Sequence, residues 1–167
     1  MTTTRPRRLA VLAAAGALAL ALLAPASAIA AHADDTSELQ ARVDAVLAEF
    51  PGGTQTAPNE IIWGDGAVIL TLAADEGLIT AKAVGSCATG YYCAYSGYNL
   101  SGSKLSLSTC NTTQSTSALS IVRSIANARS SGYVQGKNSS GTVLATVSAG
   151  GSLAYASTNI TRLTCVS

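Results

Sequence analysis

The chain has 167 residues, of which 48% are hydrophobic and only 11% are charged, and its formal net charge is +1. Without the first 33 residues, seven Lys and Arg face nine Asp and Glu, and the net charge is −2. This balance gives no electrostatic footprint for nucleic acid, so we expect no nucleic-acid partner. The remaining length suits one small domain with an extension.

Residues 1–33 have the pattern of an export signal peptide. Three arginines precede an apolar run, Leu9–Leu23, which Pro25 ends before two small-x-small sites. We expect cleavage after Ala33, because a polar stretch begins at Asp34. The alternative is an uncleaved anchor, since residues 9–31 carry no charge and could span a bilayer. We expect the cleaved chain to be secreted and extracellular, with no membrane contact.

Residues 34–84 form an acidic extension, with nine acids against two bases. Asp35-Thr36-Ser37 before Glu38 predicts the start of one short helix, with acids near the positive end of its dipole. Pro51 stops this helix. Its apolar positions recur on one face: Leu39, Val43, Val46, Leu47 and Phe50.

A β-hairpin is predicted next, because Gly64-Asp65-Gly66 separates the apolar runs 60–63 and 67–72. Residues 73–83 resemble a linker, and we place a boundary near residues 74–86. Two interpretations of the acidic extension stay open. It is a propeptide that covers a basic domain during export, or, slightly favoured, an ordinary subdomain that packs its hairpin on the core.

Residues 85–167 are expected to form a disulfide-braced β domain. This half has no Asp or Glu, and it contains all six tyrosines of the chain. Short apolar alternations separated by Gly, Ser and Asn turns predict a sandwich or closed sheet. The predicted strands are 91–95, 104–107, 120–126, 132–135, 142–147, 152–155 and 159–165. The basic residues favour an acidic partner surface: Lys104, Arg123, Arg129, Lys137 and Arg162.

The four cysteines of the chain all lie in this β domain: Cys87, Cys93, Cys110 and Cys165. An even count in a small secreted chain predicts two disulfides, with three possible pairings. We prefer Cys87–Cys93, which closes a short loop around Gly90, and Cys110–Cys165, which ties the last strand to the body. A zinc site is disfavoured because no Cys-x2-Cys pair occurs.

Catalytic chemistry is hard to build from these residues, and we expect no enzyme, no cofactor and no metal site. The only histidine, His32, lies in the predicted signal peptide, so no Ser-His-Asp or Cys-His arrangement is available. Four acids of the extension could pair in principle, but solvated surface is the better interpretation: Glu60, Asp65, Asp75 and Glu76. Recognition is the function that remains.

The tyrosines of the segment 91–98 are candidates either for the core or for contacts with a partner. Period-2 alternation puts Tyr91, Cys93 and Tyr95 on one face of a strand and Tyr92 on the other. Packing in the core or at a sheet edge is favoured, since tyrosine readily fills half-buried strands. Tyr98 follows in the next turn and belongs to the same set.

A family resemblance rests on these motifs. Cys87-x5-Cys93 with Gly90, followed by Tyr95-Ser96-Gly97 and Leu100-Ser101-Gly102, resembles the start of the streptomycete metalloproteinase-inhibitor family. Ala118 and the strand 123–127 are similar to that family as well, and residues 59–72 resemble the extension found before such domains. The resemblance covers roughly residues 59–135. It implies a mainly β, Greek-key βγ-crystallin-like sandwich with two disulfides.

The same resemblance implies a secreted peptidase inhibitor of extracellular metalloproteinases, with an extracellular peptidase as partner. We carry over the Cys87–Cys93 clamp and the fold, and leave the peptidase-contacting residues unknown. Two alternatives remain: a non-inhibitory extracellular binding module, and a killer-toxin-like antimicrobial domain by fold analogy. We expect a monomer.

Overall fold

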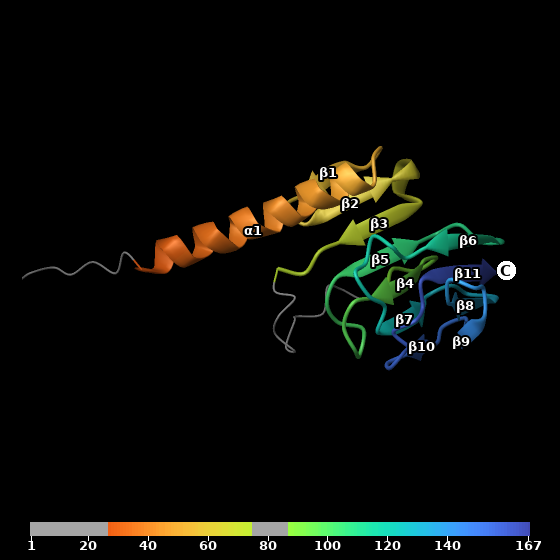
Figure 1. Cartoon of the computed structure of the whole chain (residues 1–167). Helices are drawn as coiled ribbons and strands as arrows, with labels where there is room; N and C mark the ends of the chain where they lie inside the picture. The colour runs from red at the N-terminus through yellow and green to blue at the C-terminus, as the bar shows by residue number, and fades with distance from the viewer. Residues whose placement is uncertain (1–26, 75–86) are drawn as a thin grey trace, which may run out of the picture.

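The computed structural model describes residues 27–74 and 87–167. Within these ranges the chain is mainly β: eleven strands form two antiparallel sheets, and one helix lies beside them (Figure 1). This confirms the predicted β-sandwich. In the part of the chain that is described, no helix is both long enough and apolar enough to cross a bilayer.

The helix α1 (Ser27–Glu49) begins earlier than predicted. The prediction placed its start at Asp35-Thr36-Ser37, but the helix passes through these residues without a break. The preceding residues are rich in alanine, the strongest helix former, so the polar triplet continues a helix instead of starting one. Residues 1–26 lie outside the described ranges, and the signal peptide 1–33 stays a prediction.

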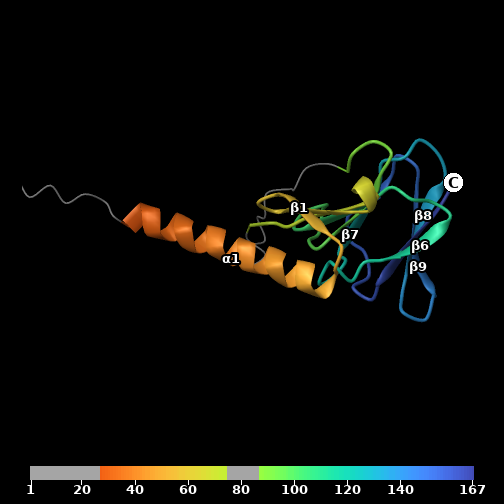
Figure 2. The same ribbon diagram turned by 90° about the horizontal axis from the view of Figure 1, so that it is seen from above.

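Four of the five apolar positions predicted for one face of α1 pack on the core, while Phe50 follows the end of the helix. Val43 is fully buried in the main core, and Leu39, Val46 and Leu47 pack against it. The end of the helix is fixed by Trp63, whose Nε1 donates to the carbonyl of Phe50 at 3.0 Å. In Figures 1 and 2, α1 lies along the β1–β3 end of the molecule and its N-terminal half projects beyond the sheets.

The predicted hairpin is confirmed. Strands β2 (Glu60–Trp63) and β3 (Val68–Thr71) pair antiparallel across the short 3-10 turn η1 (Gly64–Gly66). A further strand, β1 (Thr54–Ala57), pairs with β2 and was not predicted. Its sequence, Thr-Gln-Thr-Ala, has no apolar alternation, so no strand signal was present.

The hairpin does not form a sheet of its own, because β3 pairs antiparallel with β5 (Lys104–Leu107), with Leu70 opposite Leu105. The resulting seven-stranded sheet has the order β1-β2-β3-β5-β4-β7-β10. Its other members are β4 (Tyr92–Tyr95), β7 (Ser124–Asn127) and β10 (Ser152–Leu153). The acidic extension and the β domain therefore share one sheet. Most of the predicted linker 73–83 lies outside the described residues.

The second sheet contains four strands in the order β6-β11-β8-β9. These are β6 (Thr112–Ser115), β11 (Arg162–Val166), β8 (Tyr133–Lys137) and β9 (Val143–Ser148). The main core includes buried residues from both sheets, among them Ile125, Leu105, Val134 and Leu163. A short β6 was not predicted, since Thr112–Ser115 is entirely polar.

Two predicted strands begin later than expected. The strand predicted at 120–126 starts at Ser124, because a turn precedes it in which Leu119 N donates to Thr116 O at 2.9 Å. The strand predicted at 159–165 starts at Arg162, after a turn closed by Ile160 N and Ser157 O at 3.2 Å. In both places an apolar residue of the predicted range, Val122 or Ile160, is buried although it lies before the strand begins.

Candidate functional site

Both disulfides are present in the pairing preferred from the sequence. Cys87–Cys93 joins residues six apart with a Cα–Cα distance of 5.8 Å, and Cys110–Cys165 joins residues 55 apart at 4.6 Å. The second bond links the segment before β6 to β11. The first fixes the turn before β4, in which Gly90 has a φ of +90° and donates its N–H to Ala128 O at 3.0 Å.

The tyrosines of β4 belong to the core, as favoured from the sequence. Tyr92 and Tyr95 are both fully buried, on opposite faces of the strand. Tyr92 Oη donates to Thr109 O at 2.9 Å. Burial raises the pKa of Tyr92 to about 12, although the positive charge of Arg129 opposes this shift. Tyr92 packs in the main core and Tyr95 in a smaller cluster with Cys93 and Ala126, so neither side chain is available to a partner.

Tyr98 differs from them, because its side chain is 46% exposed. It lies in the loop 96–103 between β4 and β5, which we call the Tyr98 loop. The loop is closed by Ser96 N to Ser103 O at 2.9 Å and by Gly97 N to Ser101 O at 2.9 Å. Ser101 Oγ also donates to Tyr98 O at 2.6 Å. The backbone on both sides of Tyr98 is thus fixed within the loop.

Glycine is required where the two arms of this loop meet. A Cβ on Gly97 would lie 2.8 Å from the carbonyl oxygen of Ser101, closer than real Cβ contacts come. Gly102 has a φ of +75°, and a Cβ there would lie 2.9 Å from Gly97 N. The Gly-x4-Gly spacing that carried the family resemblance is therefore the spacing that lets the loop close.

The Tyr98 loop is also bonded to β7 and to the segment after β10. Leu100 N donates to Ser124 Oγ at 2.9 Å, and this hydroxyl donates to Gly97 O at 2.6 Å. Asn99 N donates to Ala154 O at 3.0 Å. Ser124 is itself fully buried, so the loop is anchored to the sheet and not only to itself.

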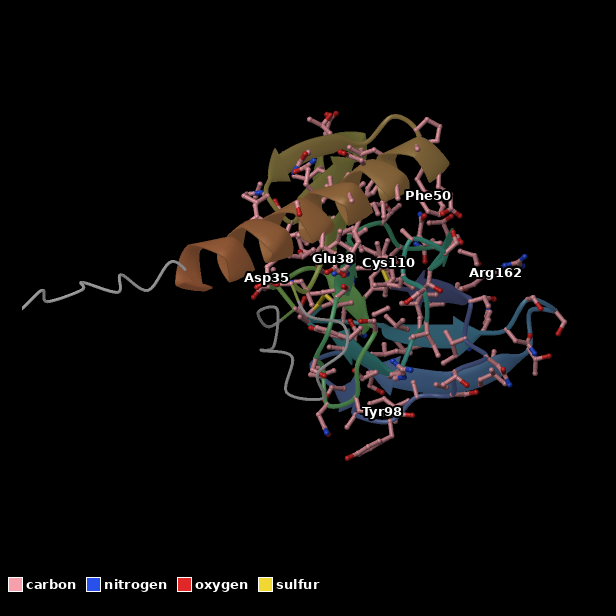
Figure 3. All side chains as sticks on the ribbon, turned by 60° about the vertical axis from the view of Figure 1, so that its left-hand side comes forward. Asp35, Glu38, Phe50, Tyr98, Cys110 and Arg162 are labelled. Carbon is pink, nitrogen blue, oxygen red and sulfur yellow. A yellow bond between two sulfur atoms is a disulfide. The ribbon has the colours of Figure 1, made fainter. Side chains whose placement is uncertain are left out.

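Tyr98 and Tyr155 stand together on this end of the molecule. Their ring centroids are 5.3 Å apart with an interplanar angle of 34°. Tyr155 is 66% exposed, and its hydroxyl accepts a hydrogen bond from Asn99 Nδ2 at 3.4 Å. The guanidinium of Arg123 lies 5.8 Å from the centroid of the Tyr98 ring and donates to Ser96 O at 2.8 Å. Figure 3 shows Tyr98 at the edge of the molecule, away from α1.

The five basic residues of the β domain lie on different strands and connecting segments. Arg129 donates to the carbonyls of Gly90 and Ser108 at 2.9 and 3.1 Å, and Arg123 donates to Ser96 as described. Burial lowers the pKa of Lys104, which the negative charge of Glu60 partly offsets. Lys137 and Arg162 are paired across β8 and β11, so only this pair presents two positive charges on neighbouring strands.

Of the four acids considered for catalysis, the structure describes Glu60 in β2 and Asp65 in the turn η1. Asp65 is exposed in the turn η1, and the carboxylate of Glu60 accepts a hydrogen bond from Thr56 Oγ1 at 2.9 Å. Asp75 and Glu76 lie outside the described residues, as does the side chain of His32. Among the residues whose side chains are described, no group of three or more His, Cys, Asp and Glu could hold a metal ion.

Comparison with known proteins gives a family match for part of the chain. Residues 80–144 match the family model of peptidase inhibitor family I36, which confirms the resemblance to the streptomycete metalloproteinase-inhibitor family. Neither the curated proteins nor the solved structures gave a match. The matched segment includes the Cys87–Cys93 disulfide and the Tyr98 loop, while Tyr155 and Cys165 lie beyond it.

The family match supports a peptidase inhibitor, and it agrees with the expectation that the chain is not an enzyme. A peptidase is accordingly the partner that the family suggests. The family and the two disulfides are compatible with an extracellular protein. The pairing of Tyr98 with Tyr155 was missed by the sequence analysis, which had left the peptidase-contacting residues unknown.

Proposed function

We propose that the protein is a secreted inhibitor of extracellular metallopeptidases. The observation that carries this proposal is the match of residues 80–144 to peptidase inhibitor family I36. The metallopeptidase class comes from the resemblance of the Cys87–Gly102 segment to the streptomycete inhibitors. The signal-peptide pattern of residues 1–33 supports export, and two disulfides suit an oxidising compartment.

The structure suggests how such an inhibitor would gain affinity. A loop that is already ordered before binding loses little conformational entropy when it meets its target. Here the Cys87–Cys93 disulfide and the hydrogen bonds of the Tyr98 loop fix two neighbouring segments on one scaffold. We propose that the mature chain acts as a monomer and that it needs neither a membrane nor a nucleic acid.

We propose further that residues 34–84 remain part of the working inhibitor. The hairpin β2–β3 adds to the edge of β5, and Leu70 and Val43 are fully buried in the core. Removal of this segment would leave the edge of β5 unpaired and expose part of the core. This favours an integrated subdomain over a detachable propeptide.

The test is an inhibition panel with the purified chain beginning at Asp34. A thermolysin-like metallopeptidase, a serine, a cysteine and an aspartic peptidase are assayed with peptide substrates. We expect inhibition of the metallopeptidase at micromolar concentration or below, and none of the other classes. The same chain without residues 34–84 should inhibit more weakly, because its scaffold is less stable. Inhibition of another class only would refute the metallopeptidase assignment.

A further inference from the structure

We propose that Tyr98 and Tyr155, which we call the tyrosine pair, form the surface that contacts the target peptidase. This inference rests on the proposed function and adds the residues through which binding occurs. Tyr155 lies in the segment after β10, outside the family match, so the proposed surface combines a family element with an element of this chain.

Exposure separates the tyrosine pair from the other aromatic side chains. In the described part of the chain, Tyr155 at 66% and Tyr98 at 46% are the most exposed large hydrophobic residues. A fully covered aromatic side chain buries about 150–250 Å², and about half of Tyr98 and two thirds of Tyr155 are still open to a partner. Tyrosine and arginine are also the residue types in which binding hot spots are enriched, and Arg123 lies against the Tyr98 ring.

The Tyr98 loop holds an unusual backbone conformation next to the pair. Asn99 and Leu100 have φ values of +54° and +59°, in the left-handed region. For leucine, whose side chain is bulky, this region is rarely populated, and such conformations concentrate at functional sites. The hydrogen bond from Leu100 N to the buried Ser124 hydroxyl holds this conformation in place. The loop is therefore preorganised around Tyr98.

The contacts within the pair also restrict its rings. The two rings touch, Asn99 Nδ2 donates to the Tyr155 hydroxyl, and Arg123 is held against Tyr98 by its bond to Ser96 O. A tyrosine has only two side-chain torsions to fix, so binding through such rings costs little entropy. The tyrosine pair is therefore a fixed aromatic surface to which a partner can bind.

The chemistry of the tyrosine pair indicates the kind of peptidase cleft that it fits. No Asp or Glu occurs in residues 85–167, so no side chain in this half would repel an acidic rim. The rings are apolar at their faces and polar at their hydroxyl tips. The matching cleft is apolar, accepts an aromatic side chain and offers a hydrogen-bond partner at its edge. Metallopeptidases that prefer large apolar residues in their substrates are the expected targets.

Alanine variants test the tyrosine pair. Ki is measured against the most sensitive metallopeptidase for the wild-type chain, for Tyr98→Ala, for Tyr155→Ala and for the double variant. The matched control is Tyr133→Ala, which removes another exposed tyrosine from β8 in the second sheet. We expect the double variant to raise Ki about 30-fold or more, the factor typical of a hot spot, and the control to leave it unchanged.

Further measurements separate binding from folding. Thermal unfolding of each variant should agree with wild type within a few degrees, because both side chains are exposed. Tyr98→Phe and Tyr155→Phe keep the rings and should retain most of the inhibition. If the alanine variants were to unfold, Tyr98→Leu and Tyr155→Leu replace them, because leucine removes the ring but keeps an apolar side chain. A folded double leucine variant with Ki near wild type would overturn the proposed contact.

The outcomes distinguish this inference from the proposed function. If the wild-type chain inhibits and the Ki of the double variant is within threefold of the wild-type Ki, the tyrosine pair is not the contact surface. The proposed function is then unaffected. A wild-type chain that inhibits no peptidase overturns both. A further outcome in sedimentation is that the wild-type chain is a dimer and that the double variant is a monomer with an unchanged Ki. That result would assign the tyrosine pair to self-association and overturn its contact with the peptidase.

Discussion

Leu70→Ala tests whether the acidic extension is an integral part of the fold. Leu70 lies in β3 and is fully buried between its neighbours across the sheet, Ile61 in β2 and Leu105 in β5. Those neighbours are 0% and 1% exposed, so the space left by the side chain cannot be filled from solvent or by a mobile loop. The substitution should therefore destabilise the β domain as well as the extension.

The size of the effect follows from burial. Leu→Ala in a core costs about 2–5 kcal/mol, and a site that cannot collapse lies towards the upper half of this range, at roughly 3–4 kcal/mol. Total stabilities of small domains are about 5–15 kcal/mol. For a chain of this size we expect the melting temperature to fall by on the order of 10 °C. Leu144→Ala, at a leucine of β9 that is 38% exposed, is the matched control and should change stability by less than about 0.5 kcal/mol.

The chain carries its own reporters for the assay. Its single tryptophan, Trp63, lies in β2 of the extension, whereas all six tyrosines follow residue 85. Urea unfolding is followed by tryptophan fluorescence and by the near-ultraviolet circular dichroism of the tyrosines. One cooperative unit requires coincident transitions, both shifted by Leu70→Ala. A shift of the tryptophan transition alone would refute the integrated fold.

Two further predictions concern stability. Burial raises the pKa of Tyr92 to about 12, above its value in the unfolded chain, so the folded state favours the neutral phenol. The resulting contribution to the free energy of unfolding is complete below about pH 10 and is lost as the pH rises towards 12. The free energy of unfolding should thus fall by up to about 3 kcal/mol over this window. Tyr92→Phe should flatten the plot of this free energy against pH, and an unchanged slope would contradict burial of Tyr92 as the cause. Replacing Cys110 and Cys165 with alanine should lower the free energy of unfolding by about 4 kcal/mol, against about 2 kcal/mol for Cys87 and Cys93, because the first pair closes a longer loop. Equal losses of this free energy in denaturant titrations would rule out loop length as the cause.

Local signals in the sequence predicted the parts of the fold that are local in the chain. The hairpin β2–β3 was found because Gly64-Asp65-Gly66 punctuates two apolar runs. The burial of Tyr92 and Tyr95 was favoured because tyrosine readily fills half-buried strands, and period-2 alternation placed the two on opposite faces. The number of cysteines predicted two disulfides, and the pairing preferred among the three possible ones is present. These predictions used neighbouring residues, residue type or a simple count.

What the sequence could not predict depends on residues far apart in the chain. The pairing of β3 with β5 joins segments separated by the predicted linker, and no local pattern specifies which edge the hairpin meets. Tyr98 and Tyr155 meet because Asn99 N donates to Ala154 O in the segment after β10. No sequence motif predicts this contact. Strands β1 and β6 are polar and partly exposed, so they are stabilised by pairing and not by an apolar pattern.

The most direct test of the proposed function is the Ki of the chain beginning at Asp34 against a thermolysin-like metallopeptidase. The enzyme is titrated with folded protein and, in parallel, with protein that has been reduced and alkylated. We expect a Ki in the micromolar range or below for the folded chain and no inhibition by the reduced one. Full enzyme activity in the presence of the folded chain, repeated with several secreted metallopeptidases, would contradict it.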